Sequence, residues 1–169
     1  MSGISETKRA GLTGLARNAI TGWALFGGVI LTLVVLINVI SVIGGVVWKP
    51  FPGDFEMTEV GVAVAAFAFL PYCQMVGANV TADIFTSGAS NRALGVFSLL
   101  ASVVALGFSL LLLSRMYLGM LDQKAFNYTT AILQFPHWIA FIPILVSLAL
   151  LAVAALITLA ESISQIRKG

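Results

Sequence analysis

The chain has 169 residues, of which 59% are hydrophobic and only 9% are charged, and its formal net charge is +2. Ordinary soluble domains carry about 25% charged residues, so this composition excludes a soluble globular fold. The small basic excess does not indicate a nucleic-acid partner, because in a membrane protein the placement of Lys and Arg is more informative than their sum.

Four long apolar stretches predict four transmembrane helices, at residues 21–47, 57–80, 93–113 and 138–160. At a rise of 1.5 Å per residue, about 20 residues cross a hydrocarbon core about 30 Å thick, and each stretch is long enough. None of the stretches contains Lys or Arg, and Glu59 is their only acid. We therefore expect an all-α membrane protein whose single four-span domain covers residues 1–169.

Residues 4–20, before the first stretch, predict an amphipathic helix. Three apolar side chains recur at helical spacing, and basic side chains occupy other positions. The apolar residues are Leu12, Leu15 and Ala19, and the basic residues are Lys8, Arg9 and Arg17. Such a helix fits the inner membrane surface, or alternatively the docking groove of a partner protein. The apolar stretch that follows is longer than the core of a signal peptide, about 7–15 residues, so we expect it to be retained.

The distribution of basic residues predicts the orientation. With a cytoplasmic N-terminus, six basic residues lie inside and three lie outside. The inner residues are Lys8, Arg9, Arg17, Arg92, Arg167 and Lys168, and the outer ones are Lys49, Arg115 and Lys124. The positive-inside rule then favours N-in and C-in, with the connections at 48–55 and 114–137 outside.

Polar residues and prolines within the spans indicate helix packing. Asn38 lies well inside the first span, where an amide most often makes an interhelical hydrogen bond worth about 0.6–2 kcal/mol. The alternative is a ligand to an ion or a substrate. Pro71 and Pro143 lie inside the second and fourth spans, where proline kinks a helix.

The residue types that membrane chemistry requires are scarce. No ionisable residue lies at the middle of a span, as a proton relay would need. His137 is the only histidine and Cys73 the only cysteine, which argues against bis-histidine haem ligation, a clustered metal site and a disulfide. We expect no catalytic, substrate-binding or metal site, no cofactor and no enzymatic activity, with a membrane-embedded enzyme as a minor alternative.

Charged and polar residues gather at the two ends of the second span. At its start, a Pro-Gly turn precedes Asp54, Glu56 and Glu59, and acids there are favourable against the positive end of the helix dipole. At its other end, Asp83 is placed to cap a helix or to pair with Arg92.

These two segments resemble the small membrane subunit of tripartite ATP-independent periplasmic (TRAP) transporters, the DctQ-like family. In that family an acid begins the second span, and a small residue followed by His-Val-x-x-Asp and a hydrophobic residue ends it. Residues 78–84 here read Ala-Asn-Val-Thr-Ala-Asp-Ile, so Asn79 stands at the usual histidine position. The sequence Pro136-His137-Trp138, followed by Pro143, is similar to the start of the family's fourth span.

The resemblance implies a component of a transporter in the bacterial inner membrane. In this family the small subunit binds a large multi-span subunit, which holds the substrate and sodium sites and moves part of itself as an elevator. A soluble periplasmic binding protein captures the substrate, often an organic acid. The small subunit would brace the large one, and sodium would bind in the partner, not in this chain.

Within that interpretation, two groups of residues are candidates for function. The outer connections would help to dock the binding protein, with Lys49, Asp54, Glu56 and Lys124 as the docking charges. The candidates for structural or subunit contacts are Asn38, Glu59, Asn79, Asp83, Arg92, Pro136 and Trp138. The alternative function is that of an accessory or assembly subunit of another membrane complex.

Overall fold

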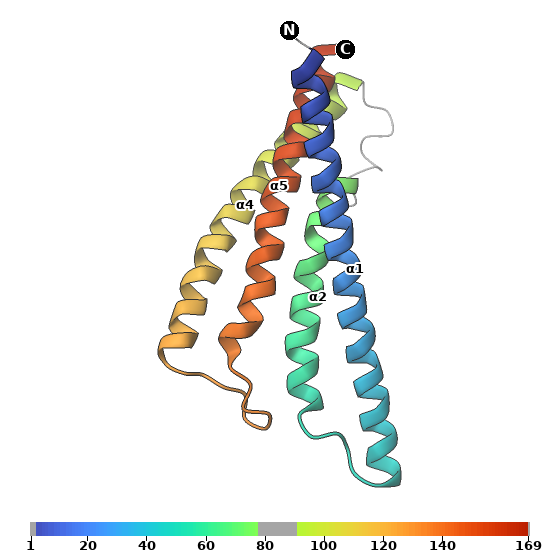
Figure 1. The fold of residues 1–169 in the computed structure, drawn as a ribbon, viewed down its shortest axis with the longest axis vertical. Coiled ribbons are helices and arrows are strands. Elements are labelled where there is room, and N and C mark those ends of the chain that lie inside the picture. The colour runs from blue at the N-terminus through green and yellow to red at the C-terminus, as the bar shows by residue number, and fades with distance from the viewer. Residues whose placement is uncertain (1–2, 78–90, 169) are drawn as a thin grey trace.

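The computed structural model describes residues 3–77 and 91–168, and the side chains of residues 13–77 and 97–164. Its helices are α1 (Gly3–Val47), α2 (Asp54–Val76), α4 (Asn91–Ala125) and α5 (His137–Lys168) (Figure 1). Each contains a segment long and apolar enough to cross a membrane. These segments are Thr13–Val47, Asp54–Val76, Phe97–Ala125 and His137–Ser164. The prediction of an all-α protein with four spans is confirmed.

The helices lie approximately in a row, in the order α4, α5, α2, α1. Helix α5 packs against both α4 and α2, and α2 packs against α1. Helix α1 begins and α5 ends at the same end of the molecule (Figure 1), which we call the terminal end. The connections at 48–53 and 126–136 lie at the opposite end, the loop end. The two termini therefore share a side, and the assignment of that side to the cytoplasm stays a prediction.

Helix α1 runs without interruption from Gly3 to Val47. The predicted amphipathic segment, residues 4–20, is therefore the first part of the same helix that spans the membrane, and the expectation of a separate helix lying on the surface is wrong. The sequence offers a reason, because residues 3–47 contain no proline that would end or redirect the helix.

The other helix bounds also differ from the apolar stretches. Helix α4 continues to Ala125, so residues 114–125 are helical and not part of a connection as predicted. Hydropathy marks where a chain leaves hydrocarbon, whereas a helix with polar side chains such as Arg115 and Asp122 continues past that point. Helix α2 starts at Asp54. It ends at Val76, because Gly77 adopts a left-handed φ of 68° and donates its N–H to the carbonyls of Cys73 and Gln74.

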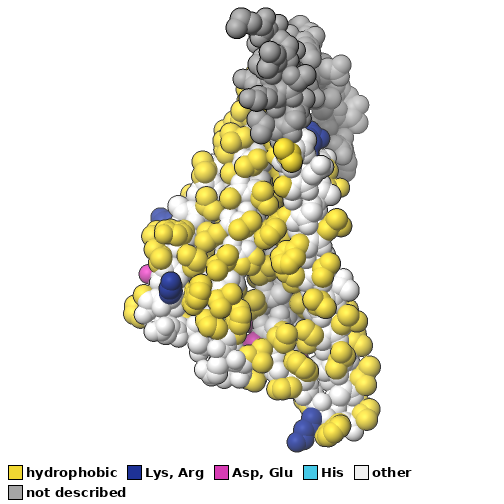
Figure 2. Space-filling model, viewed as in Figure 1, with side chains coloured by type: hydrophobic (Ala, Val, Ile, Leu, Met, Phe, Trp, Pro, Cys, Tyr) yellow, Lys and Arg dark blue, Asp and Glu magenta, His cyan; other side chains and the backbone are white. Residues whose placement is uncertain are grey.

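The interior is thin, and much of it consists of small residues. A Cβ on Gly27 would lie 2.7 Å from the Cβ of Ala68, so α1 and α2 approach closely at that point. Val64, Ile144 and Leu148 form the apolar core between α2 and α5. Hydrophobic side chains cover most of the visible face (Figure 2), as expected of a protein surrounded by lipid or by a membrane partner.

Candidate functional site

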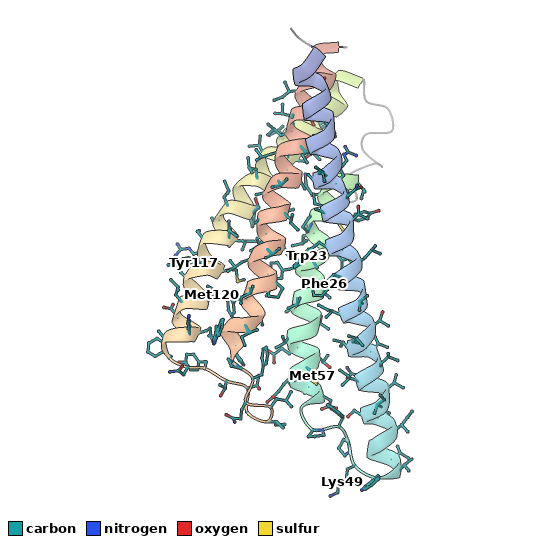
Figure 3. The ribbon with its side chains drawn as sticks, in the orientation of Figure 1. Trp23, Phe26, Lys49, Met57, Tyr117 and Met120 are labelled. Atoms are coloured by element: carbon teal, nitrogen blue, oxygen red, sulfur yellow. The ribbon has the colours of Figure 1, made fainter. Side chains whose placement is uncertain are left out.

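The first turn of α2 contacts both connections of the loop end. The connection at 48–53 leads directly into Asp54, and the connection at 126–136 reaches across to Glu56. The position of these segments relative to Lys49 and Met57 can be followed in Figure 3. Glu56 binds its connection directly, whereas Asp54 acts on the other connection through Ser41.

Asp54 holds the shorter connection against α1. One of its carboxylate oxygens accepts a hydrogen bond from the Ser41 hydroxyl of α1. The same hydroxyl accepts the backbone N–H of Phe51 at 3.2 Å. The second carboxylate oxygen accepts the N–H of Phe55 at 2.8 Å. Ser41 is 4% exposed, so the chain satisfies its polar groups internally, as buried polar groups require.

Asn38 lies about one helical turn before Ser41, farther from the loop end. Its side chain joins α1 to α2. Its Nδ2 donates to Thr58 Oγ1 of α2 at 2.6 Å and to the carbonyl of Val34 at 2.8 Å. Thr58 in turn donates to the carbonyl of Asp54 at 2.7 Å. The amide therefore makes an interhelical hydrogen bond, the role that an isolated asparagine most often has in a span.

Glu56 holds the longer connection. Its Oε1 accepts the backbone N–H of Ile132 at 2.7 Å, and its Oε2 accepts that of Leu133 at 3.0 Å. We call these two bonds the Glu56 contact. Because the acceptor is ionised, both bonds are charge-assisted and stronger than bonds between neutral groups. The contact fastens the tip of the α4–α5 connection to the start of α2.

Leu133 also packs directly onto the backbone at Gly53. Gly53 has a φ of 81°, in the left-handed region. A Cβ at this position would lie 2.5 Å from Cγ of Leu133. Glycine is therefore favoured here both by the backbone conformation and by the close approach of the connection.

The connection at 126–136 is held in a defined conformation by its own hydrogen bonds. The N–H of Thr130 donates to the carbonyl of Phe135 at 3.0 Å, and the N–H of Phe135 returns to the Thr130 hydroxyl at 3.0 Å. The N–H of His137 donates to the carbonyl of Tyr128 at 3.1 Å, and Thr129 and Pro136 form an isolated bridge. The connection is therefore structured before any partner binds.

Charged and aromatic side chains surround this structured surface. Lys124 lies over the ring of Trp138, with 5.2 Å between Nζ and the ring centroid, a cation–π contact. Lys49 is exposed at the loop end of α1 (Figure 3). The large exposed side chains of the two connections are Trp48, Phe51, Phe126, Tyr128, Ile132 and Leu133.

The predicted site residues thus fall into different environments. Asp54 and Glu56, expected to face a partner, bind groups of their own chain. Lys49 and Glu59 are exposed. Asn79 and Asp83, and the side chain of Arg92, lie outside the described residues. Ser41, Thr58 and the backbone of 132–133 also take part, although no signal in the sequence distinguishes them.

The terminal half of the molecule has a different polar network. Gln74 Nε2 of α2 donates to Thr158 Oγ1 of α5 at 3.2 Å, and Ser102 Oγ of α4 donates to the same oxygen at 3.1 Å. Two further contacts join helices in this half, Ser98 of α4 with Ser162 of α5 at 2.8 Å and Arg17 of α1 with Glu161 of α5 at 2.6 Å. This network joins helices to one another, whereas Glu56 at the loop end binds a connection.

Comparison with known proteins identifies the family. No curated protein and no solved structure matches the chain. Within the described part of the chain, no three His, Cys, Asp or Glu side chains gather as they would around a metal ion. The sequence profile of the family described as "Tripartite ATP-independent periplasmic transporters, DctQ component" matches residues 31–165, which include the latter part of the first span and the whole of the other three. The chain therefore belongs to the DctQ family, whose members are the small membrane subunits of TRAP transporters.

Proposed function

We propose that the chain braces the large elevator-type subunit of a sodium-coupled TRAP transporter that imports an organic acid, and that its loop end helps to dock the periplasmic binding protein. Family membership supports the transporter and the two partners, and DctQ is a family of transporter components, not of enzymes. The chain would lie in the bacterial inner membrane with both termini in the cytoplasm.

The row of helices supports the bracing role. A row presents two broad faces, and large apolar side chains such as Leu36, Val104 and Leu111 are at least half exposed on the helices. In a membrane such faces pack against lipid or against another subunit at little desolvation cost. A scaffold subunit needs this kind of surface and no site for substrate.

The structured loop end supports the docking role, and it is the observation that we rely on most. A binding surface that is already ordered loses less conformational entropy when its partner binds. The Glu56 contact and the packing of Leu133 on Gly53 provide this order. We therefore propose that Asp54 and Glu56 position the connections, while Lys49, Lys124 and the exposed aromatic side chains meet the binding protein.

The test uses Glu56→Gln, with Glu59→Gln as its matched control. Both changes remove one acid from α2, but only Glu56 binds the connection at 126–136. Each variant is produced with the large subunit and the binding protein, and two quantities are measured, the recovery of the large subunit and the affinity for the binding protein.

We expect Glu56→Gln to weaken binding-protein affinity while the large subunit is recovered in equal amount, and Glu59→Gln to leave binding-protein affinity unchanged. Unchanged affinity in Glu56→Gln would contradict the docking role. If no large multi-span subunit co-purified with the wild-type chain, the bracing role would be contradicted. Co-purification of the chain with an unrelated membrane complex would favour an accessory function.

A further inference from the structure

A groove of about 550 Å³ lies between α1 and α2. Its walls include Leu33 and Ile37 of α1 and Val60 of α2. The connection at 126–136 closes it toward the loop end, where Leu133 and neighbouring residues of that connection form the wall. The groove thus starts within the spans and ends beneath the connection that Glu56 holds.

The groove is apolar along most of its length, and its few polar residues lie at the end nearest the connection. The walls contributed by α1 are aliphatic, whereas Thr130, Gln134 and Glu56 lie at the end nearest the connection. Glu56 is the only ionisable residue among the described residues that line the groove, and none of them is Lys or Arg. This arrangement of walls matches an amphiphile that has an apolar tail and a headgroup that tolerates or prefers a nearby negative charge.

We propose that this groove binds one acyl chain of a phospholipid whose headgroup contains an amine, such as phosphatidylethanolamine. The tail would lie along Leu33, Ile37 and Val60, and the ammonium group would approach Glu56. This inference concerns a lipid site and does not depend on the proposed docking of the binding protein.

The size of the groove favours a lipid tail over a helix of a partner subunit. An α-helix with its side chains is about 10 Å across, so 550 Å³ would enclose only about 7 Å of it, little more than one turn. The connection at 126–136 would also block a helix that continued toward the loop end. A single hydrocarbon tail is slender enough to enter from the side.

The surroundings of Glu56 favour an amine in the headgroup. The Glu56 carboxylate accepts the backbone N–H groups of 132–133, and the Thr130 side chain and the Ala131 backbone also donate to it. These donors are neutral and leave its negative charge in place, so the carboxylate attracts an ammonium group and repels an anionic headgroup. The apolar part of the groove is also a poor site for water, which needs two to four polar partners.

The test uses a phospholipid with a photoactivatable diazirine in its acyl chain. The full chain, assembled with its large subunit, is placed in vesicles of phosphatidylethanolamine and phosphatidylglycerol that contain a trace of probe, made with either headgroup. Labelled residues are identified by mass spectrometry. Ile37→Trp fills the groove, and Leu36→Trp is the matched control, because Leu36 is the adjacent residue and does not line the groove. If the Ile37→Trp variant does not assemble with the large subunit, Ile37→Phe, a smaller change, takes its place in the experiment.

We expect labelling concentrated on the groove residues, lost in Ile37→Trp and retained in Leu36→Trp. The amine probe should label about fivefold more than the phosphatidylglycerol probe, the ratio expected for one charge near a membrane surface, and Glu56→Gln should reduce that ratio.

Three results would overturn the proposal. Even labelling along all four helices would indicate bulk lipid only. Labelling of the isolated chain that disappears on assembly would show that side chains of the large subunit fill the groove. Equal labelling by the two probes would refute the headgroup assignment.

Discussion

The loop end and the terminal half of this molecule hold their polar groups in place by different means. At the loop end, Glu56 accepts two backbone N–H groups of the connection at 126–136, and Asp54 accepts the Ser41 hydroxyl, which in turn accepts the N–H of Phe51. In the terminal half, hydroxyl and amide side chains such as Ser102 and Gln74 bond to one another across helices. The loop end therefore depends on single charged residues, whereas the terminal half shares its bonds among many neutral ones.

This difference predicts how each region responds to substitution. Hydrogen bonds between transmembrane helices are worth about 0.6 kcal/mol each on average, so losing one in the terminal half is a small change. At the loop end one carboxylate holds two backbone groups of a connection, so its loss removes two hydrogen bonds at once. The following predictions test this contrast in order of decreasing effect.

The largest effect is expected at Gly53. Gly53→Ala places a Cβ against Leu133 and requires a left-handed φ from an alanine, which costs about 1–2 kcal/mol for the backbone alone. Thermal unfolding in detergent should show this loss. Gly107→Ala is the control, because a Cβ there meets nothing within 4 Å and alanine favours a helix. Equal stability of the two variants would refute the close packing of Leu133 on Gly53.

Glu56→Ala should release the connection without unfolding the helices. The amides of Ile132 and Leu133 lose their acceptor, so their hydrogen exchange should accelerate about tenfold or more. Exchange within α2 and α5 should change little. Glu59→Ala provides the comparison and should leave all these rates as they are. Slow exchange at 132–133 in Glu56→Ala would show that the connection is held by its internal bonds alone.

Asn38→Leu should destabilise the α1–α2 pair by about 0.6–2 kcal/mol, because it removes the interhelical bond to Thr58. A double-mutant cycle with Thr58→Val isolates this bond from other effects of the two changes. We expect the double variant to lose less stability than the sum of the single variants. Additive losses would mean that the two side chains contribute independently.

The sequence predicted the parts of the fold that depend on composition. Long apolar stretches require spanning helices, and all four are present. The end of α4 was misplaced, because residues 114–125 include charged side chains and still favour a helix. The continuity of α1 was missed for a related reason, since amphipathic periodicity does not distinguish a surface helix from the extension of a span.

The candidate site was predicted less well than the fold. Acids at the start of α2 were found from their spacing and the helix dipole. The partners of Glu56 were not, because they are backbone N–H groups more than 70 residues away, and every residue except proline has such a group. Asn38 was expected to bond to another helix, but nothing in the sequence distinguished Thr58 from the other hydroxyl residues as its partner.

The smallest effect is expected at the ion pair of the terminal half. Arg17 and Glu161 join α1 to α5 at 2.6 Å, but their side chains are 46% and 50% exposed, and exposed pairs typically contribute about 0–1 kcal/mol. Arg17→Gln should therefore lower the unfolding temperature only slightly, and high salt should reduce the difference from wild type. The exchanged variant, Arg17→Glu with Glu161→Arg, should recover the loss. A large loss that salt does not affect would place this pair in a low-dielectric environment and would make the terminal half as dependent on single charges as the loop end.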